Sequence, residues 1–203
     1  MLTILPVSPL RILALGDSYT IGEGVLPGER WPVQLVARLR SERGLQVSEP
    51  LIIARTGWTT EELWNGIDQA APPAGFDLVT LLIGVNDQYR GRPLSGYEEQ
   101  FSRLLSRAVS LASGQPDRVL VLSIPDWGIT PFGLASERQG ISAEIDAFNT
   151  ANRAISIRAG AIFVDITPLS RRAAYDPTLL AEDGLHPSRH MYAAWVQEIL
   201  QVI

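Results

Sequence analysis

The chain has 203 residues, 46% of them hydrophobic, and its 17 basic and 22 acidic side chains give a formal net charge of −5. This length fits one α/β domain over residues 1–203, and the apolar fraction can supply a core without disulfides or metal ions. The chain contains neither cysteine nor lysine, which excludes thiol nucleophiles, thiolate metal sites, lysine Schiff bases and phosphate-loop lysines. The basic residues are all arginine and lie scattered, so nucleic acid is not an expected partner.

The beginning of the chain gives an expectation about location. Residues 1–10 contain two prolines and lack both the charged start and the long apolar run of a secretory signal. We therefore expect a cytoplasmic protein. No apolar stretch reaches the roughly 18 residues that indicate a membrane-spanning helix, so no membrane span is expected. The sequence leaves the oligomeric state open.

Short runs rich in Leu, Ile and Val recur along the chain and are typical of parallel strands buried on both faces. They cover residues 11–15, 51–54, 78–84, 118–124 and 161–166. We therefore expect five buried parallel strands.

Helical patterns fill the intervals between these runs. Thr59 with Glu62, and Ser95 with Glu98, have the spacing of a capping box, in which the two side chains satisfy backbone N–H groups at a helix start. The predicted helices cover residues 31–43, a segment opening at Thr59, and residues 95–112, 142–159 and 188–202. Strands and helices thus alternate from one end of the chain to the other.

That alternation predicts an α/β fold in which helices cover both faces of an open parallel sheet. In such sheets, ligands bind beyond the carboxyl ends of the strands. The segments that leave those ends are residues 16–29, 55–58, 85–94, 125–133 and 167–187. Functional side chains are expected on these segments.

A serine stands at the tip of the first predicted strand, in the sequence Gly16-Asp17-Ser18. Only two histidines exist, His186 and His190, so any imidazole base must come from this pair. Asp183 precedes His186 by three residues in a turn-prone loop, a spacing that allows the carboxylate to orient the imidazole. Taken singly, the serine also fits an ordinary turn, and His186 also fits a surface position before the last helix.

Two further segments carry hydrogen-bond donors of the kind that acyl transfer needs. Gly57 follows the second strand, and Asn86 follows the third. An unhindered glycine N–H and a side-chain amide are both suited to stabilising the negative charge on a carbonyl oxygen. Each also has a simpler reading, as a tight turn or a polar strand exit.

Together these segments resemble the four signature blocks of the SGNH (GDSL) hydrolases, in the family order and over nearly the whole chain. The blocks are Gly16-Asp17-Ser18, Gly57, Gly84-x-Asn86-Asp87 and Asp183-x-x-His186-Pro187. The resemblance implies a three-layer doubly wound, flavodoxin-like fold with a five-stranded parallel sheet in the order 2-1-3-4-5.

The resemblance also implies a role for each residue. Ser18 is the nucleophile, His186 is the base and Asp183 orients it. The backbone N–H groups of Ser18 and Gly57 and the side-chain amide of Asn86 form the oxyanion hole. Cofactors and metal ions are not implied.

One departure concerns Tyr19, which stands where the name motif of the family has leucine. Asp17 and Asp87 match family positions that we expect to hold loops rather than move protons. Gly16 to Thr20 does not read Gly-x-Ser-x-Gly, which argues against the nucleophile elbow of the α/β-hydrolases.

The expected substrate is a small ester with a short acyl or aryl group, because no long insertion between the blocks is available as a lid. Thioesterase or lysophospholipase activity and carbohydrate O-deacetylation stay open as alternatives on the same triad. Aromatic side chains after strand ends are candidates for substrate binding, although loop packing explains each one equally well. They are Tyr19, Trp58, Tyr89, Trp127 and Phe132.

Two rival classes are also weighed. A metal-dependent hydrolase would use Asp183, His186 and His190, but Pro187 and Ser188 intervene and no His-Glu-x-x-His pattern is present. A non-catalytic or flavin-binding doubly wound domain would need a phosphate loop after the first strand, where this chain has an aspartate instead. Both rivals explain less of the sequence than an ester hydrolase does.

Overall fold

The computed structural model describes residues 8–203, so most of the segment on which the expectation about a secretory signal rests lies outside the described part. The strands form one parallel sheet in the order β2-β1-β3-β4-β5. Their bounds are β1 (Ile12–Gly16), β2 (Leu51–Ala54), β3 (Leu78–Leu82), β4 (Val119–Leu122) and β5 (Ile162–Val164). The predicted fold class and strand order are confirmed.

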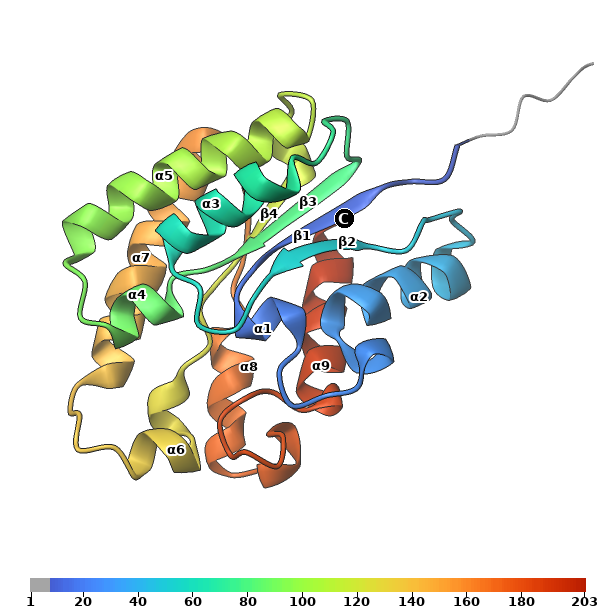
Figure 1. Cartoon of the computed structure of the whole chain (residues 1–203). Helices are drawn as coiled ribbons and strands as arrows, with labels where there is room; N and C mark the ends of the chain where they lie inside the picture. The colour runs from blue at the N-terminus through green and yellow to red at the C-terminus, as the bar shows by residue number, and fades with distance from the viewer. Residues whose placement is uncertain (1–7) are drawn as a thin grey trace, which may run out of the picture.

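Helices cover the sheet on both faces, and the longer ones pack in two layers (Figure 1). Helices α3, α5 and α7 lie on one side, and α2, α8 and α9 lie on the other. The helices are α1 (Ser18–Ile21), α2 (Trp31–Arg43), α3 (Thr60–Ala70), α4 (Val85–Tyr89), α5 (Leu94–Leu111), α6 (Pro131–Leu134), α7 (Ile141–Ala159), α8 (Thr167–Arg171) and α9 (Arg189–Val202). Within residues 8–203, no helix has the length and apolar character needed to cross a membrane.

The helix starts show where local sequence signals hold. The capping box at Thr59 is present: its side chain accepts from the Glu62 N–H, and the Glu62 carboxylate accepts the Thr59 N–H at 2.8 Å. The prediction of a capping box at Ser95 is wrong. Helix α5 begins one residue earlier, after Pro93, so Ser95 lies inside the first turn and no side chain caps the helix.

The core lies on both faces of the sheet, because every residue of β1 and β4 is buried. Trp31 of α2 and Trp195 of α9 are fully buried on one side. Phe101 of α5 and Leu63 of α3 are fully buried on the other. Burying each such side chain contributes roughly 1.5–3 kcal/mol, and this packing keeps the strands in one register.

The register aligns the carboxyl ends of the strands. Gly16, the last residue of β1, lies beside both Ala54 of β2 and Leu82 of β3. Leu122 of β4 lies beside Val164 of β5 in the same way. The segments that follow therefore meet at one edge of the sheet.

The backbone at Gly84 gives a test of this packing. Gly84 has φ +123°, and a Cβ there would lie 2.4 Å from the Oη atom of the buried Tyr97. We expect Gly84→Ala to lower the free energy of unfolding by about 2–4 kcal/mol, through backbone strain and overpacking. Gly96→Ala, in a helix with no atom within 4 Å, should be neutral or stabilising by up to about 1 kcal/mol. Urea unfolding measures both, and equal effects would contradict the prediction.

Candidate active site

Ser18 is the first residue of α1 and follows β1 after a single residue. That residue, Asp17, caps the helix: its Oδ1 atom accepts the Tyr19 N–H at 3.0 Å. The turn requires glycine at position 16, because a Cβ there would lie 2.5 Å from the Leu82 carbonyl oxygen. Close packing of β1 against β3 thus holds the Ser18 side chain at the predicted edge of the sheet.

His186 lies in the loop before α9, paired with Asp183. The Asp183 Oδ2 atom lies 2.6 Å from the His186 Nδ1 atom, and Oδ1 accepts the N–H groups of Leu185 and His186 at 2.9 Å each. Gly184, with φ +65°, allows the turn between them. The carboxylate favours the tautomer that carries its proton on Nδ1, which leaves Nε2 free to accept a proton.

Burial and hydrogen bonding act oppositely on the Asp183 carboxyl. Partial burial alone would raise its pKa, but hydrogen bonds from the His186 ring and from the His186 and Leu185 backbone outweigh burial, so the pKa lies below its usual value. Asp183 therefore stays ionised at neutral pH. Its side chain is 39% exposed, whereas that of His186 is 11% exposed.

The expected oxyanion donors lie on the two neighbouring strand exits. Gly57 has φ +83°, a conformation that favours glycine, in the turn between β2 and α3. Asn86 lies in the first turn of α4, and its Nδ2 atom donates to the Trp58 carbonyl oxygen at 2.9 Å. Among residues 8–203 the second N–H of this amide has no acceptor, so it can donate to a further group.

A cavity of about 250 Å³ joins these groups. Ser18 and His186 both line it, although no hydrogen bond joins their side chains in this part of the described chain. Such bonds are often long before substrate binds. The lining residues are Ser18, Tyr19, Thr56, Gly57, Val85, Asn86, Tyr89, Trp127, Phe132, Leu185 and His186.

Four of the five aromatic candidates line this cavity, and Trp58 is the exception. The Trp58 indole packs on Gly66 of α3, where a Cβ would lie 2.2 Å from its Cη2 atom. Trp58 thus anchors its loop to α3, and its place in substrate binding stays a prediction. Tyr89 and Phe132 pack around Trp127 with ring centroids 5.4 and 6.0 Å apart from it, and they form the apolar wall.

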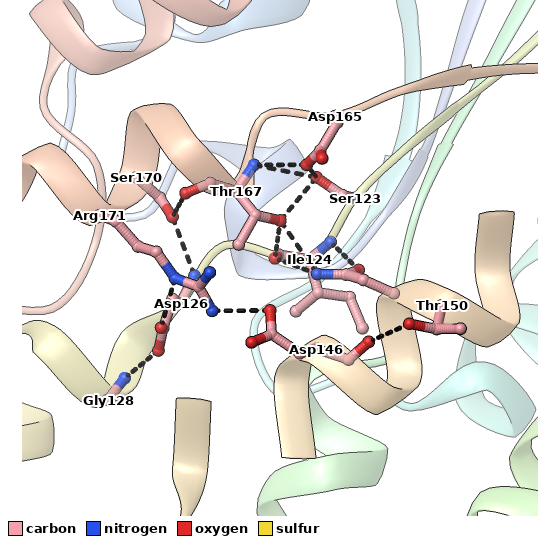
Figure 2. Close-up of polar contacts among 11 residues, drawn as sticks. Ser123, Ile124, Asp126, Gly128, Asp146, Thr150, Asp165, Thr167, Ser170 and Arg171 are labelled. Carbon is pink, nitrogen blue, oxygen red and sulfur yellow. Dashed lines mark hydrogen bonds and ion pairs between the residues drawn. The ribbon is translucent and has the colours of Figure 1, made fainter. Parts of the chain in front are cut away.

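A polar network behind this wall fixes the loop that carries Trp127 (Figure 2). Asp126 accepts the Gly128 N–H at 2.9 Å and the Arg171 Nε–H at 3.0 Å, while its own N–H donates to Ser170 at 3.0 Å. Arg171 also donates to Asp146 of α7 at 2.7 Å. Side chains of α7 and α8 thereby hold the segment after β4 in place through these hydrogen bonds.

Sequence reasoning missed three lining residues, Thr56, Val85 and Leu185. Each of them stands next to a motif residue in the sequence, and this position is the one signal that could have predicted them. His190 lies exposed in the first turn of α9, and it is absent from the cavity lining. Within residues 8–203, no three His, Asp or Glu side chains are grouped as a metal site would need.

Two buried carboxyl groups, Asp17 and Asp87, lie in the segments that follow β1 and β3. Burial raises the pKa of Asp17 to about 8, and the nearby charge of Asp87 also raises it. The hydrogen bond from the Tyr19 N–H lowers this pKa in part. Burial also raises the pKa of Asp87, although the Thr60 N–H and hydroxyl, each 2.9 Å away, lower it in part. Both groups hold loops, as expected, and neither lines the cavity.

The family model that matches this sequence defines a class, the hydrolases that act on ester bonds. The chain belongs to the GDSL-like lipase/acylhydrolase family, whose model matches residues 14–194. No curated protein matches the sequence.

Solved structures with the same fold share little sequence with this chain. A lipolytic G-D-S-L protein from Veillonella parvula DSM 2008 is 19% identical with a TM-score of 0.73, covering 96% of this chain and 98% of that one. The acetylxylan esterase Axe2 from Geobacillus stearothermophilus is 20% identical with a TM-score of 0.72, covering 96% and 94%. TesA is 17% identical with a TM-score of 0.72, covering 95% and 97%.

The raised pKa of Asp17 predicts a pH-dependent stability. Its pKa rises from 3.8 to about 8 on folding, so the folded state binds the proton more tightly and stability falls as pH increases across that range. Asp17→Asn keeps an acceptor for the Tyr19 N–H without this titration. Its stability relative to wild type should therefore increase with pH, by at most about 1.4 kcal/mol per pH unit.

Urea unfolding at pH 5, 7 and 9 measures this difference. Asp117→Asn, at an exposed position, is the matched control and should show no trend. A constant difference between Asp17→Asn and wild type would show that Asp17 is ionised in the folded protein throughout.

Proposed function

We propose that this protein hydrolyses esters through an acyl-enzyme intermediate on Ser18. The Ser18 hydroxyl attacks the acyl carbonyl while His186 Nε2 takes its proton, and the protonated imidazole then donates that proton to the leaving alcohol. Water repeats the sequence: His186 removes a proton from the water as its oxygen attacks the acyl-enzyme. The protonated imidazole then returns that proton to the Ser18 oxygen as the bond to the acyl group breaks and the acid leaves. No cofactor takes part.

The observation that carries this proposal is the 2.6 Å contact between Asp183 and His186, with His186 and Ser18 lining one cavity. A carboxylate behind the imidazole stabilises the imidazolium that forms during attack. The lowered pKa of Asp183 supports this role, because the orienting group must be charged.

The oxyanion hole consists of the Ser18 and Gly57 N–H groups and the free N–H of Asn86. All three residues line the same cavity. Preorganised donors of this kind stabilise the tetrahedral intermediate, and each is worth roughly 10²–10³ in kcat.

The substrate we propose carries a short acyl or aryl group. A volume of about 250 Å³ lies below the roughly 300–1,000 Å³ of sites for drug-sized ligands. The aromatic wall suits a compact apolar group. Likeness to Axe2, an acetylxylan esterase, favours an acetyl ester of a carbohydrate as a second candidate. Thioester or lysophospholipid substrates stay as further alternatives on the same residues.

Covalent labelling tests the nucleophile. A fluorophosphonate should label wild type at Ser18, and peptide mapping locates the adduct. Ser18→Ala and His186→Ala should each lower kcat by about 10⁴-fold or more, and Asp183→Ala should lower it less. Ser102→Ala, whose hydroxyl bonds only within α5, is the control. An adduct on any residue other than Ser18 rules out this mechanism.

A series of p-nitrophenyl esters, used below their micelle-forming concentrations, tests the acyl group. We expect kcat/KM for acetate or butyrate to exceed that for palmitate by about 10-fold or more, because one missing or extra methylene alone is worth roughly 10–200-fold. Phe132→Ala should widen the cavity and reduce this preference. Leu134→Ala, 75% exposed in the same helix and outside the cavity, should leave it unchanged. A steady rise of kcat/KM with chain length would contradict the compact site.

A further inference from the structure

The loop that carries Gly57 accepts hydrogen bonds from two side chains, one in α4 and one in the residue that caps its C-terminus. Asn86 donates to the Trp58 carbonyl oxygen at 2.9 Å, and Arg90 Nη2 donates to the Gly57 carbonyl oxygen at 2.6 Å. Asn86 and Arg90 are four residues apart, a spacing that places two side chains on one face of a helix. Two consecutive carbonyl groups of the loop are therefore bound by one face of α4 and its cap.

Arg90 is itself anchored at a second point. Its Nη1 atom lies 3.2 Å from the Glu62 Oε2 atom, the atom that also accepts the Thr59 N–H in the capping box. Partial burial would raise the pKa of Glu62, but bonds from Thr59 and Arg90 outweigh it and lower that pKa. One carboxylate thus holds both the start of α3 and the guanidinium.

The Gly57 N–H belongs to the peptide unit between Thr56 and Gly57, and this unit is held from both sides. The Thr56 hydroxyl bonds to the carboxylate of Glu23, which follows α1. Arg90 fixes the following peptide through the Gly57 carbonyl oxygen. Since glycine has the widest backbone freedom of any residue, its N–H direction depends on such external contacts.

We infer that Arg90 is a positioning residue for the oxyanion hole. By holding the Gly57 carbonyl group, Arg90 fixes the backbone of Gly57 so that the Gly57 N–H points into the cavity. This inference rests on the proposed function, because it assigns Arg90 to the same hole. Arg90 is absent from the cavity lining, so it acts through Gly57 rather than by touching the substrate. Its planar guanidinium contacts Gly57 and Glu62 together, which a lysine ammonium does less well.

The test compares Arg90→Ala and Arg90→Lys with wild type on p-nitrophenyl acetate. A small misplacement of a catalytic group costs up to about 10²-fold, so Arg90→Ala should lower kcat by about 10-fold to 100-fold while KM stays within about 2-fold. Arg90→Lys should retain more kcat than Arg90→Ala. Guanidinium at millimolar concentration should restore part of the lost kcat in Arg90→Ala.

Arg107→Ala is the matched control, because Arg107 pairs with Asp68 at 3.0 Å on the surface of α5 and is similarly exposed. It should keep wild-type kcat and gain nothing from guanidinium. Asn86→Ala gives the scale for losing a direct donor, roughly 10²–10³ in kcat. Thermal melting identifies misfolding, and should Arg90→Ala misfold, Arg90→Lys carries the kcat and KM comparison.

The outcomes separate this inference from the proposed function. Wild-type kcat in a folded Arg90→Ala overturns the positioning role, and so does a raised KM with unchanged kcat, which would make Arg90 a substrate contact. In both cases, labelling of Ser18 by fluorophosphonate still supports the proposed function. Absence of labelling in wild type would instead contradict the proposed function itself.

Discussion

Gly16 is the position at which the sheet and the site constrain each other. It ends β1 between Ala54 and Leu82, and a Cβ on it would lie 2.2 Å from the Thr20 Oγ1 atom. The backbone of β1 can therefore turn into α1 only where a side chain is missing. Because the turn is this close to β3, Ser18, two residues further on, lies beside the exits of both neighbouring strands. Any larger residue would move Ser18 away from Gly57 and Asn86 on the neighbouring strand exits.

Buried carboxyl groups fix the conformations of the irregular loops that follow the strands. Asp17, Asp87 and Asp126 follow β1, β3 and β4, and all three are almost fully buried. Each accepts at least one backbone N–H that its loop or a neighbouring helix would otherwise leave unpaired. An unpaired buried N–H costs about 1–3 kcal/mol, so each carboxyl group fixes one loop conformation. The raised pKa values of Asp17 and Asp87 show the cost of placing these groups away from water.

The sequence predicted the parts that depend on short-range patterns. Apolar runs marked the strands, and Thr59 with Glu62 marked a real helix start. It failed at Ser95, because Pro93 moves the start of α5. The ring direction of Trp58 has no local signal either, since it depends on the absence of a side chain at Gly66. Contacts such as that between Arg90 and Gly57 join residues 33 positions apart. No local pattern encodes them, since they arise only once β2 and β3 are both placed beside β1.

The two halves of the site are held in different ways. Ser18, Gly57 and Asn86 come from strand exits that are fixed by buried carboxyl groups and by contacts between neighbouring elements. His186 instead comes from an irregular loop, and the Asp183 carboxylate that orients it is 39% exposed. The Phe132 N–H donates to the Gly184 carbonyl at 3.2 Å, which ties this loop to the aromatic wall of the cavity. Segments with exposed hydrogen bonds and few buried contacts open more readily than core strands. The segment that forms the aromatic wall is therefore joined to the loop that carries His186 by a backbone hydrogen bond, which a change of the Phe132 side chain leaves in place.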